Sequence, residues 1–306
     1  AAHPDAVDRL NLATDRFNLR VETGTTFGGK TMKRIYTWDA RPVQRNLTAA
    51  DILACKGKRK LVQTTANTAE EAAAAEDAGL DLIMGNAHNT AAVRQGSETL
   101  FFTAALGLPD YPAETDILNA AFAALKDGAD AIYTARGPHI VEMLAREEIP
   151  VMCHLGLVPR KSTWRGGLRA IGGTADEAVE LFQAFRRMED AGAFSVEAEV
   201  ICDRVMAEIS QRTTLITTSL GSGRGADVIY LFQNDICGEQ QDSPRHARAF
   251  GNLLALQQQM AAERRAALSA FREAALGGTF PGTAETPTIA DAEFDGFLEA
   301  LDQAAT

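Results

Sequence analysis

Two glutamates near the middle of the chain have the residue type and the spacing for acid–base chemistry. Glu197 and Glu199 are separated by one residue in a predicted strand, 194–199, so their side chains lie on the same face of that strand. Two carboxylates that are one pleat apart shift each other's pKa, which lets one of them act as an acid or a base near neutral pH. We expect Glu199 at the open end of the strand and Glu197 one layer deeper. The alternative is a structural pair on the opposite face, bound to an arginine.

A single histidine, His154, ends a short apolar strand, 151–154, and a glycine-bearing loop follows it. The carboxyl ends of parallel strands are where a barrel places its catalytic groups. We therefore expect His154 to contact a substrate or to transfer a proton. A core histidine that is hydrogen-bonded to the backbone is the alternative interpretation.

Polar groups follow two further predicted strands. Arg136 comes after the fourth strand and could bind a carboxylate or phosphate through two parallel hydrogen bonds. Ser222 and Gly223 lie in a glycine-rich turn, 221–225, whose backbone N–H groups could bind an anion. A solvated loop charge and a plain flexible turn are the respective alternatives. We include Arg136, Ser222 and Gly223 among the predicted substrate-binding residues.

The elements that must position these residues alternate between short β-rich runs and helical stretches rich in Ala and Glu. Eight runs are predicted as strands: 61–66, 81–85, 99–104, 130–134, 151–154, 194–199, 214–219 and 227–232. A helix or a helical turn follows each run. Three connections, 78–81, 127–130 and 191–194, contain a glycine that ends a helix and leads into the next strand, as is typical of parallel sheets.

Eight such units predict an α/β fold, a single (β/α)8 TIM barrel over residues 47–278. Residues 1–46 form a predicted N-terminal arm that packs on the barrel or on a neighbouring subunit, and 279–306 form a C-terminal helical tail. A doubly wound open sheet is the alternative. It is weakened because no G-x-G-x-x-G follows the first strand.

Composition excludes several classes of function. The net charge is −11 and no basic patch with interleaved aromatic residues occurs, so we expect no nucleic-acid partner. No apolar run approaches the roughly 20 residues that span a bilayer, so we expect no membrane segment. The N-terminus shows no secretory signal pattern. The 4 cysteines are far apart, which fits reduced thiols in a cytoplasmic protein.

Several motifs together resemble the ketopantoate hydroxymethyltransferase family, which lies within the phosphoenolpyruvate mutase/isocitrate lyase superfamily of barrels. The likeness runs from about Lys33 to Pro281. Its strongest block is 150–167, where Pro-Val-Met-Cys-His-Leu-Gly-Leu-Val-Pro and a later Gly-Gly resemble the family's pattern around its histidine. The other matching segments are 64–67, 191–199, 221–223, 243–245 and 280–282.

The resemblance implies a specific chemistry. Family members bind a small 2-oxo acid on a divalent metal, usually magnesium, and a glutamate at the position of Glu199 removes the proton next to the carbonyl. The enolate then attacks methylenetetrahydrofolate and gains a hydroxymethyl group. A metal stabilises such an enolate as a Lewis acid. The resemblance also implies a homo-oligomer.

The departures from the family pattern fall on the implied magnesium site. The family's Gly-Asp-Ser is Gly85-Asn86-Ala87 here. Asn86 therefore stands at a family ligand position but binds a metal less well than Asp would. We include Asn86 and Glu197 among the predicted substrate-binding residues. No acid stands at the equivalent place after the third strand, 99–104. After the fourth strand, Tyr133-Thr134-Ala135 replaces a Lys-x-Glu pattern. Magnesium binding is therefore implied by the family but not by the residues that this chain offers.

Three interpretations of function remain open. The first is a hydroxymethyltransferase or aldolase-type lyase that acts at the carbon next to the carbonyl of a 2-oxo acid, with Glu199 as the base and His154 as a catalytic contact. The second is a different reaction on a small oxo acid, such as hydrolysis or decarboxylation, in the same superfamily of barrels. The third is a non-catalytic barrel that binds a small acid.

Overall fold

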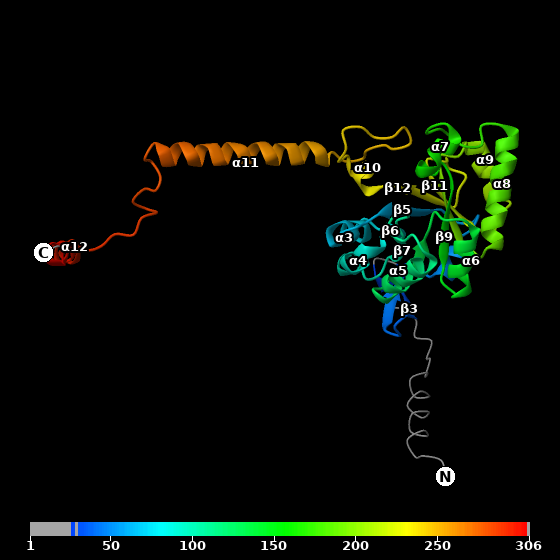
Figure 1. Cartoon of the computed structure of the whole chain (residues 1–306), viewed down its shortest axis with the longest axis horizontal. Helices are drawn as coiled ribbons and strands as arrows, with labels where there is room; N and C mark the ends of the chain where they lie inside the picture. The colour runs from blue at the N-terminus through cyan, green and yellow to red at the C-terminus, as the bar shows by residue number, and fades with distance from the viewer. Residues whose placement is uncertain (1–25, 28–29, 305–306) are drawn as a thin grey trace, which may run out of the picture. The chain divides into compact units, whose positions relative to one another are not determined.

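The protein is seen in a computed structural model that describes residues 26–27 and 30–304. Its centre is a closed barrel of parallel strands in the order β5 to β12, with β12 paired to β5 (Figure 1). The strands are β5 (Leu61–Thr65), β6 (Leu82–Asn86), β7 (Phe101–Ala105), β8 (Ala131–Tyr133), β9 (Val151–Gly156), β10 (Ser195–Glu199), β11 (Ile216–Leu220) and β12 (Val228–Leu231). The predicted (β/α)8 barrel is confirmed, and each observed strand overlaps its predicted run.

Helices follow the strands and cover the outside of the barrel (Figure 1). They are α3 (Ala69–Asp77), α4 (Thr90–Gly96), α5 (Glu114–Lys126), α6 (Pro138–Arg146), α8 (Ala175–Asp190), α9 (Asp203–Ser210) and α10 (Gln233–Cys237). Three of them end at the predicted glycines, because Gly79, Gly128 and Gly192 have φ angles of 77°, 110° and 89° that glycine adopts without strain.

Alternate residues of the strands fill the barrel in layers, because successive side chains of a strand point to opposite faces. One apolar layer contains Leu61, Leu82, Phe101, Ala131, Ile216 and Val228. Further along the strands, a second group contains Met84, Met152, Leu220 and Tyr230. The same alternation directs residues 154 and 197, near the carboxyl ends of β9 and β10, into the barrel.

Part of the predicted N-terminal arm packs on the barrel. Strand β3 (Lys33–Tyr36) pairs with β4 (Pro42–Arg45) in an antiparallel hairpin, and β1 (Thr26–Phe27) pairs with β2 (Lys30–Thr31). At the end of β4, Arg45 Nε lies 2.8 Å from Asp130 Oδ1, and Asp130 Oδ2 accepts a bond of 2.6 Å from Arg94. Residues 1–25 and 28–29 of the predicted arm lie outside the described residues.

The chain divides into two compact units. The first unit contains the barrel and extends to Ile236, with 243–248 added. The second unit contains 237–242 and the chain from Ala249 onward. Short helix α2 (Ala49–Ala54) lies in the first unit. Helix α11 (Leu253–Leu276) belongs to the second unit, together with α12 (Asp291–Ala304).

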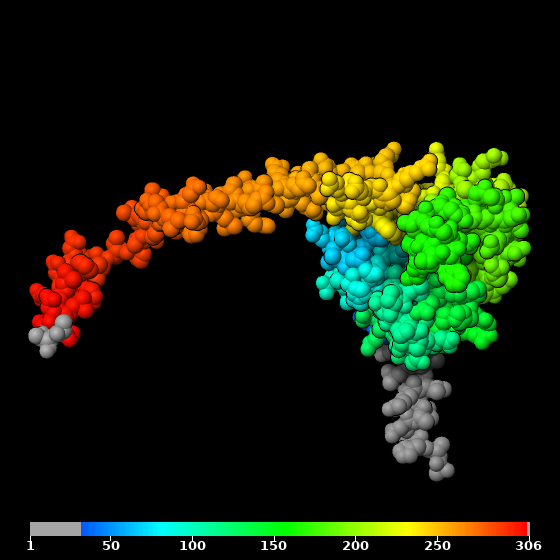
Figure 2. Space-filling model, turned by 45° about the horizontal axis from the view of Figure 1, so that its top comes forward, coloured from blue at the N-terminus to red at the C-terminus, as the bar shows by residue number. Residues whose placement is uncertain are grey.

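The second unit consists largely of helix. Within α11 and α12, both described over their whole length, no residue is buried. Figure 2 draws the side chains of both units, with α11 in orange. Among the described residues, no helix combines the length and the apolar character that crossing a membrane requires.

Candidate active site

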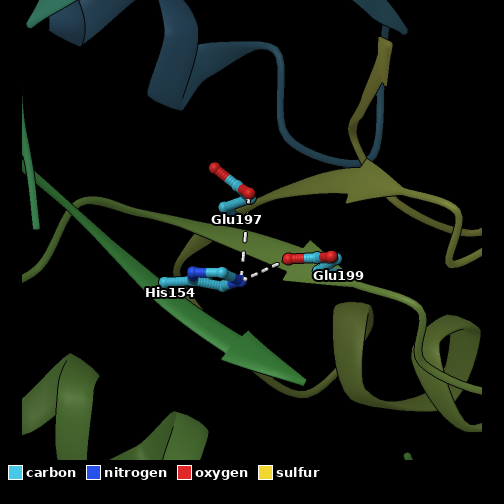
Figure 3. Close-up of side chains that lie close together, drawn as sticks. All are labelled: His154, Glu197 and Glu199. Carbon is cyan, nitrogen blue, oxygen red and sulfur yellow. Dashed lines mark ion pairs between the residues drawn. The ribbon is translucent and has the colours of Figure 1, made fainter. Parts of the chain in front are cut away.

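His154, Glu197 and Glu199 converge inside the barrel, from two neighbouring strands. Strands β9 and β10 are parallel, with His154 opposite Glu197 and Gly156 opposite Glu199. The Nε2 atom of His154 lies 3.0 Å from Glu199 Oε2 and 3.9 Å from Glu197 Oε1 (Figure 3). The structure thus brings together the three residues that the sequence singled out first.

The side chains of this cluster become less exposed with distance from the barrel mouth. The side chain of Glu199 is 12% exposed, whereas those of Glu197 and His154 are 5% and 4% exposed. Glu199 therefore lies nearer the barrel mouth, and Glu197 lies deeper. Burial raises the pKa of Glu197; the charge of His154 opposes this rise and the charge of Glu199 adds to it. Neither His154 Nε2 nor Glu197 Oε2 forms a well-directed hydrogen bond with any described residue.

Two tyrosines that were not among the predicted site residues surround the cluster. The hydroxyl of Tyr133, on β8, lies 2.7 Å from His154 Nδ1 and fixes the imidazole ring. Burial, and then the charges of Glu197 and Glu199, raise the pKa of Tyr133 well above its ordinary value, so the hydroxyl stays neutral. Tyr230, on β12, is also buried, and its hydroxyl has no partner among the described residues. Counting alternate residues along each strand would have found both.

Arg160 is a third residue that sequence reasoning missed. It lies in the one-turn helix Pro159–Lys161 that follows β9, and its side chain is exposed. Its charge lowers the pKa of Tyr133, although the effect of burial is larger. A basic residue in the loop directly after the strand of His154 was the available signal. Arg160 brings a positive charge to the loop beside the cluster.

Arg136 is engaged with a neighbouring loop. Its Nη2 atom donates hydrogen bonds of 2.9 Å to the carbonyl of Leu108 and 2.6 Å to that of Tyr111. These bonds hold the loop after β7 against the end of β8. Contact between Arg136 and a substrate stays a prediction.

Asn86 lies at the end of β6 with its side chain exposed. Its backbone N–H donates to Asn67 Oδ1 at 2.8 Å, which ties the end of β6 to the loop after β5. The residue before it must be small, because a Cβ atom on Gly85 would stand 2.0 Å from the carbonyl oxygen of Ala66. Asn86 is thus held at the barrel mouth, and its contact with a substrate stays a prediction.

Ser222 joins the loops after β10 and β11. Its completely buried hydroxyl donates to the carbonyl of Ala198 at 2.7 Å and accepts from the N–H of Ile201 at 2.8 Å. These two bonds enclose Val200, which has a φ of 47°, a conformation that costs a β-branched residue strain. Ser222 therefore fixes the backbone directly after Glu199.

Gly223 completes the same turn. Its φ is 85°, and a Cβ atom there would stand 2.7 Å from Cβ of Asp203, at the start of α9. Only glycine allows this close approach without a shift of α9. Direct contact of Ser222 or Gly223 with a substrate stays a prediction.

The positions where the resemblance implies magnesium ligands do not supply the carboxylates that this ion prefers. Asn86 offers a neutral amide, and Ala105, at the end of β7, and Ala135, just after β8, offer only methyl groups. Mg²⁺ is bound by oxygen ligands, with carboxylates supplying the charge. In contrast, His154, Glu197 and Glu199 each offer one ligand atom, and these atoms all lie within 4.8 Å of one another.

Comparison with known proteins supports one family. The family model of ketopantoate hydroxymethyltransferase matches residues 84–283. A 3-methyl-2-oxobutanoate hydroxymethyltransferase of Thermotoga neapolitana is 33% identical over 224 residues, 65% of this chain and 83% of the relative. The enzyme of the same name from Nitratidesulfovibrio vulgaris is 29% identical over 286 residues, 85% of this chain and 91% of the relative.

Solved structures with a similar fold are more distant. One is 2,3-dimethylmalate lyase, a member of the PEP mutase/isocitrate lyase superfamily, with 15% identity, a TM-score of 0.47, and coverage of 85% of this chain and all (100%) of that chain. Another is phosphonopyruvate hydrolase in complex with oxalate and Mg²⁺, with 12% identity and a TM-score of 0.47. The match covers 84% of this chain and 99% of that chain.

Proposed function

The chain belongs to the ketopantoate hydroxymethyltransferase family, and from this premise we propose that it is an enzyme acting at the carbon next to the carbonyl of a small 2-oxo acid. The reaction forms or cleaves a C–C bond at that carbon. The observation that carries the proposal is the 3.0 Å contact between His154 Nε2 and Glu199 Oε2 at the carboxyl ends of β9 and β10.

Glu199 is the proposed base. It is the more exposed of the two carboxylates, so a substrate entering from the barrel mouth reaches it before Glu197. Its carboxylate takes the proton from the carbon next to the carbonyl, and the electron pair of the broken C–H bond moves onto the carbonyl oxygen to form an enolate. A positioned general base contributes about 10²–10⁴-fold to the rate of such a step.

His154 is the proposed contact for the substrate oxygen. When the hydroxyl of Tyr133 donates to Nδ1, the hydrogen of the neutral ring is on Nε2 and points toward the carboxylates. This N–H can donate to the developing enolate oxygen without a change in the ring's orientation. Arg136, Asn86, Glu197, Ser222 and Gly223 complete the proposed substrate-binding site.

The finer details follow from the family. The relatives' names make 3-methyl-2-oxobutanoate the first substrate to test, and methylenetetrahydrofolate is the proposed one-carbon donor. The widely spaced cysteines support a cytoplasmic protein. The resemblance to the family supports a homo-oligomer.

Proton exchange tests the proposed function. The full chain is incubated with 3-methyl-2-oxobutanoate in D₂O, and proton NMR follows loss of the signal from the hydrogen next to the carbonyl. We expect exchange with the wild-type protein and a loss of at least about 100-fold with Glu199→Gln, because the base is removed while the side-chain size is kept. Glu180→Gln, on the exposed surface of α8, is the matched control and should exchange at the wild-type rate. Folded wild-type protein that exchanges neither this acid nor other 2-oxo acids would rule the proposal out.

A second candidate function is a different reaction on a small oxo acid, such as lyase, hydrolase or decarboxylase chemistry. It is favoured by Asn86, Ala87 and Tyr133 at positions where the resemblance implies other residues. Exchange without transfer of a one-carbon group from methylenetetrahydrofolate would support this candidate. Tight binding of an oxo acid without exchange or turnover would instead indicate a non-catalytic acid-binding barrel.

A further inference from the structure

We propose that His154, Glu197 and Glu199 bind one divalent ion of the first transition series, at a place in the barrel different from the magnesium site that the family resemblance implies. The binding of the ion follows from the geometry alone. Its part in the reaction rests on the proposed function, because an ion beside Glu199 would stabilise the negative charge that develops on a 2-oxo acid. With the ion bound, His154 Nε2 would coordinate it, and the ion would replace the N–H of the metal-free ring as the contact for the enolate oxygen.

The distances between the three side chains suit a shared ion. Ligand atoms that are each about 2.0–2.2 Å from one ion lie roughly 3–3.5 Å apart at tetrahedral or octahedral angles. The separation of His154 Nε2 from Glu199 Oε2 is 3.0 Å, and its separation from Glu197 Oε1 is 3.9 Å. A small rotation of the Glu197 side chain would close the longer of the two gaps.

Two atoms of the cluster are buried without a well-directed hydrogen bond. The side chains of His154 and Glu197 are 4% and 5% exposed, and His154 Nε2 and Glu197 Oε2 make no well-directed hydrogen bond to any described residue. An unsatisfied buried polar atom costs about 1–3 kcal/mol, more if it is charged, so native structures rarely leave such atoms unpaired. A cation between the three side chains would be the missing partner of both residues.

The hydrogen bond on the other side of the imidazole also fits an ion. Metal-binding histidines use their second ring nitrogen to bond an orienting group, which fixes the tautomer and the ring plane. The Tyr133 hydroxyl lies 2.7 Å from His154 Nδ1 in that position. When Nδ1 carries the hydrogen and donates it to the Tyr133 oxygen, the lone pair of Nε2 faces the two carboxylates, as shown by the convergence in Figure 3.

The set of ligand atoms indicates which ions fit. One imidazole nitrogen and two carboxylate oxygens suit Mn²⁺, Fe²⁺, Co²⁺ or Zn²⁺, whereas Mg²⁺ prefers oxygen ligands alone. Cys153, the neighbour of His154, packs in the apolar cluster outside the strands and supplies no sulfur. Three protein ligands leave coordination positions open, as in catalytic metal sites. The ion would use Glu199 Oε2, and Oε1 would remain available to take a proton.

A cobalt titration tests the inference on the full chain after treatment with a chelator. We expect one equivalent of Co²⁺ to bind with a visible absorption band, and equimolar Zn²⁺ to displace it while a large excess of Mg²⁺ does not. Glu197→Gln and His154→Gln should each weaken Co²⁺ binding by about 100-fold or more, since even loss of an orienting partner costs 10–100-fold. His139→Gln, which changes an exposed histidine in α6, is the control and should bind as the wild type does.

Binding that survives in both Glu197→Gln and His154→Gln would place the ion elsewhere and overturn the inference, as would the absence of stoichiometric binding by the wild type. If the variants fail to fold, X-ray absorption of the wild-type Zn²⁺ complex decides instead. One nitrogen among oxygen ligands at about 2.0–2.2 Å is expected, and a sulfur ligand would contradict the site. Proton exchange without stoichiometric metal binding would support the proposed function and overturn the ion site. Metal binding without exchange would support the ion site and count against the proposed function.

Discussion

At the scale of the residue, the spacing of Glu197 and Glu199 was enough to predict that both carboxylates share one face, since strand alternation is a property of the backbone. The end of an apolar run was enough to predict that His154 lies at the carboxyl end of its strand. The contact between them was not predictable, because it depends on the register of two strands that are separated by the whole of α8. The pairing of β8 and β12 with their own neighbours brings Tyr133 and Tyr230 beside the cluster. The resemblance marked Tyr133 only as a replacement for another residue, and Tyr230 lies in none of the matching motifs.

The two tyrosines should respond differently to loss of their hydroxyl groups. Tyr133→Phe leaves the buried Nδ1 of His154 without its partner, so we expect the free energy of unfolding to fall by about 1–3 kcal/mol. Tyr230→Phe removes a buried hydroxyl that has no partner among the described residues, so its effect should be neutral or stabilising. Urea denaturation of both variants measures the difference. Equal destabilisation by both substitutions would show that the Tyr133–His154 contact contributes nothing.

At the scale of the element, the alternation of apolar runs, helix formers and glycine turns predicted all of the barrel strands, because each βα unit repeats the same local chemistry. The antiparallel pair β3–β4 was not predicted. Its strands are short and mostly exposed, so they lack an apolar period, and a buried arginine on β4 that reaches Asp130 holds the pair in place. Tertiary ion pairs of this kind leave no local pattern in a sequence.

The ion pair between Lys56 and Asp227 should make the free energy of unfolding depend on pH. Burial on its own raises the pKa of Asp227, but hydrogen bonds from Thr217, Lys56 and Gly57 outweigh it and leave the pKa below its ordinary value. A carboxyl with a lowered pKa in the folded state stabilises the fold above the pKa of the unfolded state, about 3.9, and loses that contribution as the pH falls through the folded-state value.

Asp227→Asn is therefore expected to lower the free energy of unfolding by about 1.5–3 kcal/mol at pH 7, because hydrogen bonds to a charged acceptor are lost. The difference from the wild type should shrink as the pH falls below about 4. Thermal or urea unfolding across this range provides the measurement. If the difference in the free energy of unfolding between the wild type and the variant stays constant down to about pH 2, the charge of Asp227 does not stabilise the contact between α2, β11 and β12.

At the scale of the whole molecule, composition predicted a large globular fold and the alternation of strand and helix runs predicted the barrel, with which the family resemblance agrees. Helix α11 has the helical composition of a barrel helix although it buries no residue. Large apolar side chains remain exposed on it, including Leu256, Met260, Leu268 and Phe271. We expect such apolar residues to be covered by a neighbouring surface.

The homo-oligomer proposed from the family should depend on this surface. Leu268 is 62% exposed and Phe271 is 55% exposed, and we expect the double substitution Leu268→Gln/Phe271→Gln to shift the protein to a smaller species in light scattering. The melting of the barrel should be little changed, since neither residue is buried. Glu263→Gln on the same helix is the control. Retention of the wild-type mass by the double variant would mean that α11 does not hold the subunits together.

The strained backbone at Val200 has a consequence for the history of the protein. Ser222 holds this residue in a conformation that valine avoids, directly after Glu199, so the fold gives up stability beside the carboxylate that we propose as the base. Selection for heat resistance alone would favour relaxing that turn, and would thereby loosen the carboxylate. Durability and the proposed catalysis thus make opposite demands on a single peptide unit.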